Sequence, residues 1–118
     1  GCRISDNVLI GSFVEINRAT IEENTKIKHL AYMADCEIGK NVNVGCGCIT
    51  CNYDGFKKSK TIIGEDSMLG CNVNFIAPVT LGKNSFIAAG STITNDVPDD
   101  SLAIARERQI NKDGWNKK

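Results

Sequence analysis

An apolar residue recurs at every sixth position along most of the chain. The series starts at Ile4 and resumes after one-residue slips near Ile21 and Ile38, and its longest unbroken run is Ile63, Leu69, Phe75, Leu81, Ile87 and Ile93. Neither the 3.6-residue period of an amphipathic helix nor the plain alternation of a strand gives this spacing. A hexad repeat is typical of a parallel β-helix, in which each hexad forms a short strand and a corner, and three hexads close one coil.

A small or β-branched residue lies four positions after most of these apolar residues. These residues are Val8, Val14, Thr25, Ala31, Val42, Cys48, Ser67, Val73, Val79, Ser85, Ser91 and Val97. We expect the repeated apolar residue to point inward and the small residue to fit beside it at a corner. Because one coil cannot bury its apolar face alone, the coils must stack. The pattern predicts an all-β fold, a parallel β-helix over residues 1–97, followed by a C-terminal tail over residues 98–118.

Composition narrows the classes of partner. The 118 residues include 14 basic and 14 acidic side chains, so no net field favours nucleic acid or a membrane surface. No apolar run approaches the ~20 residues that span a bilayer. The first residues also lack the apolar segment of a signal peptide, so we expect a cytoplasmic protein.

The six cysteines do not form a recognisable metal motif. The cluster Cys46-Gly-Cys48-Ile-Thr-Cys51 mixes corner and strand positions, whose side chains point in different directions and do not surround a tetrahedral ion. The others, Cys2, Cys36 and Cys71, are scattered. We interpret the cysteines as reduced, buried small hydrophobes and expect no metal site. A single histidine also excludes a zinc site built from three histidines of one chain.

The repeat fails most clearly at residues 51–61. This segment contains the turn signal Asp54-Gly55 and three lysines that cannot face a core, Lys57, Lys58 and Lys60. We therefore expect a loop extruded from the coil. One interpretation is a tolerated surface insertion. The other is a loop that reaches over a neighbouring surface, with Asn52, Tyr53 and a cationic tip suited to a phosphate.

Two further features are open to two interpretations each. His29 follows the inward Ile27 by two residues, which places it at an outer corner. It is either an ordinary surface residue or a general base, since histidine exchanges a proton near neutral pH.

The basic tail, which includes Arg106, is either solvated or clamps a polyanionic ligand such as coenzyme A.

Several motifs occur together in a specific order: His29-Leu-Ala-Tyr32, Ile38-Gly-Lys-Asn-Val-Asn43, Ile49-Thr-Cys-Asn-Tyr-Asp-Gly55, Ile76-Ala-Pro-Val-Thr80, Ile87-Ala-Ala-Gly-Ser91 and Gly114-Trp115. With them, the chain from about Gly11 to Trp115 closely resembles the C-terminal acetyltransferase domain of the bacterial bifunctional N-acetylglucosamine-1-phosphate uridyltransferase/glucosamine-1-phosphate N-acetyltransferases. The hexads are shared by many acyltransferases, whereas the Cys-Asn-Tyr-Asp-Gly loop with His-Leu-x-Tyr is far more specific.

The resemblance implies a left-handed parallel β-helix, an exception to right-handed crossover, assembled as a homotrimer with active sites between subunits. It implies transfer of an acetyl group from acetyl-CoA to glucosamine 1-phosphate, for UDP-N-acetylglucosamine biosynthesis. His29 matches the general base of the family. Positions that match sugar-phosphate contacts are Asn17, Tyr32, Asn43 and Lys58. Positions that match the acetyl-CoA site are Cys46, Asn52, Tyr53, Cys71, Ala89 and Arg106.

The chain departs from the family in three ways. The uridyltransferase domain has no counterpart among these residues. The arginine that the resemblance leads us to expect just upstream of Gly1, for the sugar phosphate, has no counterpart among them either. The lysine expected twelve residues before the histidine is replaced by Asn17, with Arg18 beside it. Three hypotheses follow: the acetyltransferase that the family implies, an acetyltransferase for a different amino sugar, and a non-catalytic trimeric β-helix fragment.

Overall fold

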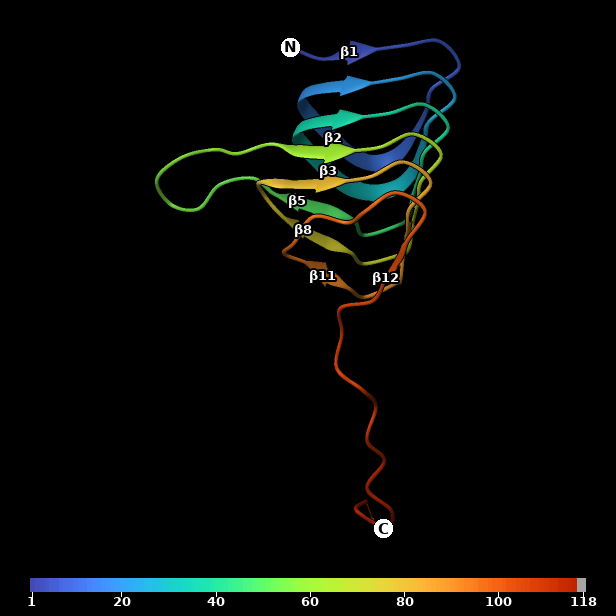
Figure 1. Ribbon diagram of the computed structural model, residues 1–118, viewed down its shortest axis with the longest axis vertical. Coiled ribbons are helices and arrows are strands. Elements are labelled where there is room, and N and C mark those ends of the chain that lie inside the picture. The colour runs from blue at the N-terminus through green and yellow to red at the C-terminus, as the bar shows by residue number, and fades with distance from the viewer. Residues whose placement is uncertain (117–118) are drawn as a thin grey trace.

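The computed structural model describes residues 1–116, which form a coil of about six turns without any helix. Figure 1 shows the coils stacked on one another, with one loop projecting sideways and the C-terminal segment running away from the stack. The strands are β1 (Arg3–Ile4), β2 (Leu9–Ile21), β3 (Lys26–Ile38), β4 (Asn43–Val44), β5 (Ile49–Cys51), β6 (Thr61–Ile63), β7 (Met68–Leu69), β8 (Asn74–Ile76), β9 (Val79–Leu81), β10 (Phe86–Ile87), β11 (Thr92–Ile93) and β12 (Leu102–Ala103).

Every strand pairs in parallel with the strand of the next coil, which produces three stacked faces. The first face contains the start of β2, the start of β3, and β4, β7, β10 and β12. The second contains the middle of β2 and β3, then β5, β8 and β11. The third contains β1, the ends of β2 and β3, then β6 and β9. β2 and β3 are long because each bends around two corners and contributes to all three faces.

The core lies inside the coil and follows the predicted hexads. Ile27, Met33, Leu69, Phe75 and Ile87 are each at most 1% exposed. Ten of the twelve small residues predicted to fit beside them are buried; Val8 and Val14 in the first coil are half-buried. Ile4 and Ile10 also belong to this coil and are 47% and 40% exposed, because a coil at the end of the stack is covered on one side only.

Thr50 occupies an inward position where the pattern would place an apolar residue. It is 1% exposed. Its Oγ1 accepts the N–H of Ala34 at 2.8 Å and lies 3.1 Å from the Ala34 carbonyl and 3.2 Å from that of Tyr32. A buried hydroxyl costs free energy unless it is hydrogen-bonded. Here the Thr50 hydroxyl is hydrogen-bonded to the backbone of β3, just before the corner at Asp35.

One column of corners is built from asparagine and aspartate. Each of these residues has φ between 54° and 64°, a left-handed conformation that Asn and Asp tolerate better than most residues. From the second coil on, each donates its N–H to a carbonyl of the preceding coil at 2.8–3.1 Å. The residues are Asn7, Asn24, Asn41, Asp66, Asn84 and Asp100. The repeated corner keeps successive coils in register, so side chains at equivalent positions lie one above another.

The segment 51–61 is an extruded loop, as predicted, and it projects from the corner between the second and third faces (Figure 1). The Ser59 N–H donates to the Asn52 carbonyl at 2.8 Å, and Tyr53 and Lys58 form an antiparallel bridge. Asp54 Oδ1 accepts the N–H groups of Phe56 and Lys57, both at 2.8 Å, which closes the tip.

The coil continues beyond residue 97. Strand β12 pairs with β10, and the N–H of Thr92 donates to the Ala105 carbonyl at 3.0 Å. The segment 98–118, predicted as a tail, therefore begins with another partial coil that ends near residue 105. This part was missed because Leu102, an apolar residue, points outward and Ala103 takes the inward position that a larger apolar residue occupies in earlier coils.

Candidate functional site

His29 stands at the head of a column of residues that occupy one corner in successive coils. Because Ile27 pairs with Val44, Val44 with Leu69 and Leu69 with Ile87, the residues two positions later are stacked: His29, Cys46, Cys71 and Ala89. Backbone hydrogen bonds continue through this corner, from Asn72 N–H to the Cys46 carbonyl and from Gly90 N–H to the Cys71 carbonyl, both at 2.8 Å.

Arg106 completes this set, which we call the His29 column: His29, Cys46, Cys71, Ala89 and Arg106. The guanidinium Nη1 of Arg106 donates to the Ala89 carbonyl at 2.6 Å. All five residues are exposed. Parallel strands lie about 4.8 Å apart, so three steps, roughly 14 Å, separate His29 from Ala89, whose carbonyl the Arg106 guanidinium contacts. The column is thus an open strip with a proton-exchanging group at one end and a cation at the other.

The corner stays narrow because Gly47 lies within it. Its φ is +83°, and a side chain there would collide with the amide oxygen of Asn72. The Gly47 N–H donates to the Leu30 carbonyl at 2.6 Å, which holds the coil of Cys46 against the coil of His29. Glycine suits this position because it adopts a left-handed φ without strain and leaves room for the Asn72 side chain of the next coil.

A second cluster lies at the corner between the second and third faces, and we call it the Asp35 corner: Arg18, Asp35 and Asn52. Arg18 Nε donates to Asp35 Oδ1 at 2.6 Å, and Arg18 Nη2 donates to Asp35 Oδ2 at 3.1 Å. Asn52 Nδ2 donates to Asp35 Oδ2 at 2.7 Å, and Asn52 is 9% exposed. The carboxylate therefore fixes the residue from which the extruded loop starts.

The same contacts favour the ionised form of Asp35. Hydrogen bonds from Arg18 and then Asn52, assisted by the positive charges of Arg18 and Lys58, lower the Asp35 pKa from 3.8 to about 2. The pKa of Arg18 is raised, chiefly by its hydrogen bond with Asp35. A carboxyl group whose pKa is lower in the folded than in the unfolded state stabilises the fold above its unfolded pKa, and this contribution disappears as the pH falls through the folded pKa.

We expect the stabilisation by Asp35 to be complete above about pH 5 and to be lost between pH 4 and pH 2. Asp35→Asn should lower the melting temperature at pH 6, and the difference from the unmodified chain should shrink as the pH approaches 2. Melting curves across this range check the prediction. Glu65→Gln is the control, because it removes an exposed 3.8 Å ion pair with Lys40, which contributes little. A deficit of Asp35→Asn that is the same at every pH would contradict the assignment.

The residues predicted to contact the sugar phosphate are not gathered in one place. Asn17 is half-buried next to Arg18 and donates from Nδ2 to Glu15 Oε2 at 2.9 Å. Lys58 is exposed on the loop, near enough to influence Asp35. Tyr32 is half-buried on the second face, and Asn43 is half-buried on the first face, where its Nδ2 lies 3.3 Å from Met68 Sδ.

A shallow apolar groove extends from the corner of the His29 column onto the second face. It has a volume of about 420 Å³, and its lining includes Phe13, Leu30, Tyr32 and Ile49. Phe13 and Leu30 are 85% and 57% exposed. Leu30 is the neighbour of His29, so the groove begins beside the head of the His29 column.

Most of the candidate residues thus form two groups within one chain, and Tyr32 and Asn43 lie outside both, on the second and the first face. The His29 column occupies the corner between the first and second faces. Asn17, Asn52, Tyr53 and Lys58 lie at the other end of the second face or on the loop, and the loop points away from its own coil (Figure 1). Asn52 and Tyr53, predicted to line the same acetyl-CoA site as the column, are therefore separated from it within the chain. Arg18 and Asp35 act together with Asn52, and their pairing was not foreseen, since only the stacking of coils brings residues 18, 35 and 52 to one corner.

The cysteines follow the prediction only in part. Cys36 and Cys48 are buried, and burial raises their pKa values to about 12 and about 11. The prediction of buried thiols is wrong for Cys2, Cys46 and Cys71, which are exposed. Cys46 and Cys71 lie at a corner where side chains point away from the core, and Cys2 belongs to the first coil, which is covered on one side only. Cys51 is half-buried.

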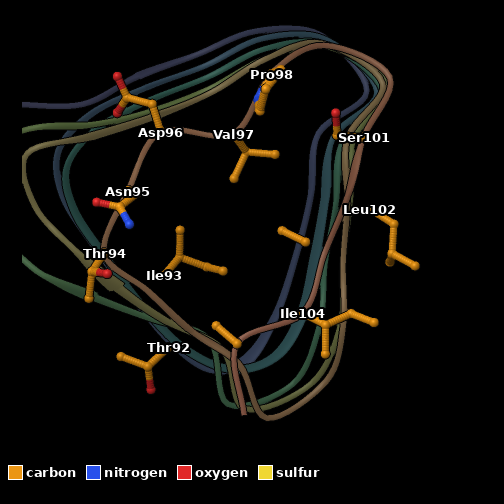
Figure 2. A pocket seen from close by; sticks show the side chains of 12 residues that line it. Thr92, Ile93, Thr94, Asn95, Asp96, Val97, Pro98, Ser101, Leu102 and Ile104 are labelled. Carbon is orange, nitrogen blue, oxygen red and sulfur yellow. The ribbon is translucent and has the colours of Figure 1, made fainter.

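The final coil contains a recess of about 440 Å³. Figure 2 shows Ile93 and Val97 pointing into the coil, whereas Leu102 points away from it. Asp96, the only ionisable side chain in its lining, already accepts the Thr80 N–H at 2.9 Å. The recess is the uncovered end of the hydrophobic core and offers no catalytic group.

Within residues 1–116, no three His, Cys, Asp or Glu side chains are grouped as ligands for a metal ion. The same residues contain no helix that could cross a bilayer.

The stacked coils and the hexad spacing are typical of one class of protein, the hexapeptide-repeat β-helices. The family described as "Bacterial transferase hexapeptide (six repeats)" matches residues 60–95. Residues 60–95 thus contain the hexapeptide repeat of these transferases, and the predicted left-handed parallel β-helix is confirmed. Its sequence is similar to the "Bifunctional protein GlmU" of several bacteria. It is 54% identical to that of Staphylococcus epidermidis over 118 residues, which cover 100% of this chain and 26% of that protein. It is 61% identical to that of Listeria monocytogenes serotype 4a over 114 residues, covering 97% and 25%.

The chain therefore spans about a quarter of the length of the curated relatives it matches, within their C-terminal part. Among solved structures, PerB from Caulobacter crescentus, in complex with CoA and GDP-perosamine, is 26% identical with a TM-score of 0.79, covering 88% of this chain and 48% of that chain. The acetyltransferase domain of PglB from Neisseria gonorrhoeae, in complex with acetyl coenzyme A, is 19% identical with a TM-score of 0.70, covering 88% and 51%. At that identity it shows the fold alone.

Proposed function

We propose that the chain transfers the acetyl group of acetyl-CoA to the 2-amino group of glucosamine 1-phosphate. The product, N-acetylglucosamine 1-phosphate, would serve UDP-N-acetylglucosamine biosynthesis. The 54–61% identity to the GlmU proteins supports this reaction. The observation that carries the proposal is the His29 column, in which four stacked residues matched to that family are joined in one exposed strip by the Arg106 guanidinium. Cytoplasmic location stays a prediction.

His29 supplies the proton chemistry. The amino group of the sugar must be unprotonated to attack, and His29 is the chain's one imidazole, exposed at the head of the column. A new C–N bond then forms at the thioester carbonyl, the C–S bond breaks, and coenzyme A leaves as a thiol. Backbone N–H groups at a corner are suited to stabilising the oxyanion that forms in between. No cysteine nucleophile is needed, because the thioester is already activated.

The rest of the column provides the donor site. Acetyl-CoA is an elongated molecule with its thioester at one end and phosphates towards the other. The column has the same polarity, with His29 at one end and the Arg106 guanidinium at the other. One Arg106 nitrogen bonds to Ala89, and the guanidinium has further donors of the kind that bind phosphate oxygens.

A second chain would complete both parts of the site. Asn52 and Tyr53, assigned to the acetyl-CoA site, and Lys58, assigned to the sugar phosphate, start or form a loop that extends away from its own column. A loop held this firmly at its base by Asp35 and at its tip by Asp54 is suited to contact a neighbouring coil. We therefore propose a homotrimer in which the loop of one chain faces the His29 column of the next.

Release of the coenzyme A thiol tests the proposal. The chain should release thiol from acetyl-CoA when glucosamine 1-phosphate is present, and much more slowly with unphosphorylated glucosamine. Mass spectrometry of the sugar product should show one added acetyl group on nitrogen. Activity with neither sugar, in a chain whose fold is verified by circular dichroism, would overturn the proposed function and favour a non-catalytic β-helix.

A second candidate is an acetyltransferase for a different amino sugar. The observation in its favour is Asn17, where the family holds a lysine, together with the structural similarity to PerB, which was solved with GDP-perosamine. Arg18 does not replace the missing cation, because both of its bonding nitrogens are directed to Asp35. A panel of amino sugars with and without phosphate or nucleotide groups would distinguish the two candidates.

The change at position 17 leads to a specific prediction. A hydrogen bond to a charged group contributes about 1.5–3 kcal/mol, so Asn17→Lys should lower the KM for glucosamine 1-phosphate by roughly 10–150-fold. The KM for acetyl-CoA should hardly change. Asn95→Lys, which adds the same charge to an exposed position of the last coil, serves as the control. An unchanged sugar-phosphate KM in Asn17→Lys would mean that another cation, such as Lys58, already holds the phosphate.

A further inference from the structure

Cys46 and Cys71 are two exposed thiols at equivalent positions of adjacent coils. Val44 pairs with Leu69, and the cysteines follow two residues later in each coil. The Asn72 N–H, next to Cys71, donates to the Cys46 carbonyl at 2.8 Å, so the register holds through the corner. Equivalent positions in parallel strands are about 4.8 Å apart, and disulfide-bonded cysteines have Cα atoms about 4.4–6.8 Å apart. The backbone thus already places this pair within reach of a disulfide.

The remaining cysteines lack this arrangement within residues 1–116. Cys36 and Cys48 are buried. Cys2 is exposed, but its register partner in the next coil is Ala19, as Arg3 pairs with Thr20. Cys51 pairs with Ile76. Exposure and register therefore select one pair, Cys46 with Cys71.

We propose that Cys46 and Cys71 form a modification site that is oxidised to a disulfide by exchange with a low-molecular-weight disulfide, such as the disulfide of coenzyme A. The thiolate of one cysteine attacks a sulfur of this oxidant, and one small thiol leaves. The second cysteine then attacks the protein-side sulfur of the mixed disulfide and releases the second thiol. The chain loses two electrons and two protons, and the oxidant gains them as two thiols.

The consequence for activity rests on the proposed function. The two sulfurs lie between His29 and Ala89, in the middle of the strip assigned to the donor. A disulfide there would change the shape of that strip and tie two coils together. Oxidation should therefore abolish most acetyl transfer, and dithiothreitol should restore it.

The modification can be tested without any assay of activity. The reduced full chain is incubated with coenzyme A disulfide or glutathione disulfide, free thiols are alkylated, and the protein is digested with trypsin without reduction. Cleavage at Lys57, Lys58 and Lys60 separates the peptide 41–57, which holds Cys46, from the peptide 61–83, in which Cys71 is the one cysteine. We expect a linked pair of these peptides that disappears after reduction.

Two cysteine variants show which residues form the disulfide. Cys46→Ser should abolish the linked pair and leave Cys71 as a mixed disulfide with the small thiol, whereas Cys51→Ser, which changes another cysteine of the same peptide, should retain the link. A linked pair that persists in Cys46→Ser, or stable mixed disulfides without any link in the unmodified chain, would overturn the proposal. If the link forms but acetyl transfer continues unchanged, the site does not lie on the donor strip. If the reduced chain shows no acetyl transfer, the proposed function fails while the cross-link result stands.

Discussion

His29→Ala should lower kcat for acetyl transfer about 10²-fold or more, as expected when a general base is removed. The imidazole is exposed at the head of the column and forms no part of the core. The substitution should therefore leave the circular dichroism spectrum and the melting temperature almost unchanged. Steady-state kinetics with glucosamine 1-phosphate and acetyl-CoA measure the effect, and the KM for acetyl-CoA should change much less than kcat.

Lys28→Ala is a matched control for this variant. Lys28 is the exposed neighbour of His29 at the same corner, so its removal perturbs the local backbone to a similar extent without removing the proton-exchanging group. We expect nearly full activity for the control. A well-folded His29→Ala protein that retains most of its activity would remove His29 from the mechanism.

The core was predictable from the sequence because one residue type recurs at one spatial position. Each hexad places its apolar residue inward, as Leu69, Phe75 and Ile87 show. The rule fails at Thr50, a polar residue at an inward position. Its hydroxyl accepts a hydrogen bond from the Ala34 N–H, and the spacing of the hexads does not predict this partner.

The neighbours of each corner residue were harder to predict, because they depend on the number of residues in each coil. Lys26 pairs with Asn43, 17 positions later, whereas Asn43 pairs with Met68, 25 positions later, since the loop lengthens that coil. This lengthening places Cys46 beside Cys71. Asn52, in contrast, precedes the loop and follows Asp35 by the ordinary 17 positions, so it shares the corner of Arg18 and Asp35. Without the coil lengths, the sequence shows these residues only as separate positions.

The division of the candidate residues between two corners explains why resemblance alone could not assemble the site. The family motifs identify His29 and the loop residues Tyr53 and Lys58 equally well. In the fold, however, the loop leaves the second face at the opposite end from the His29 column. A productive arrangement of both groups therefore calls for two chains, which makes oligomerisation part of the catalytic hypothesis.

Mixing two inactive variants tests this arrangement. His29→Ala removes the base from the column, and the double variant Tyr53→Ala/Lys58→Ala removes the exposed, bridged pair on the loop. Each protein alone should be nearly inactive. A trimer that contains both variants has three column–loop contacts, and one of the three combines an intact column with an intact loop from the next chain. Co-expression with two different affinity tags isolates such mixed trimers, and activity near a third of that of the unmodified protein is the expected result.

The control uses two variants of the same column. Because His29 and Arg106 belong to one strip of one chain, trimers that mix His29→Ala with Arg106→Ala should contain no site with an intact column, and their activity should stay at the average of the two parents. If the first mixture also stays at that average, the loop and the column act within one chain. Light scattering that shows a monomer at micromolar concentration would lead to the same conclusion, since a monomer cannot bring the loop of one chain to the column of another.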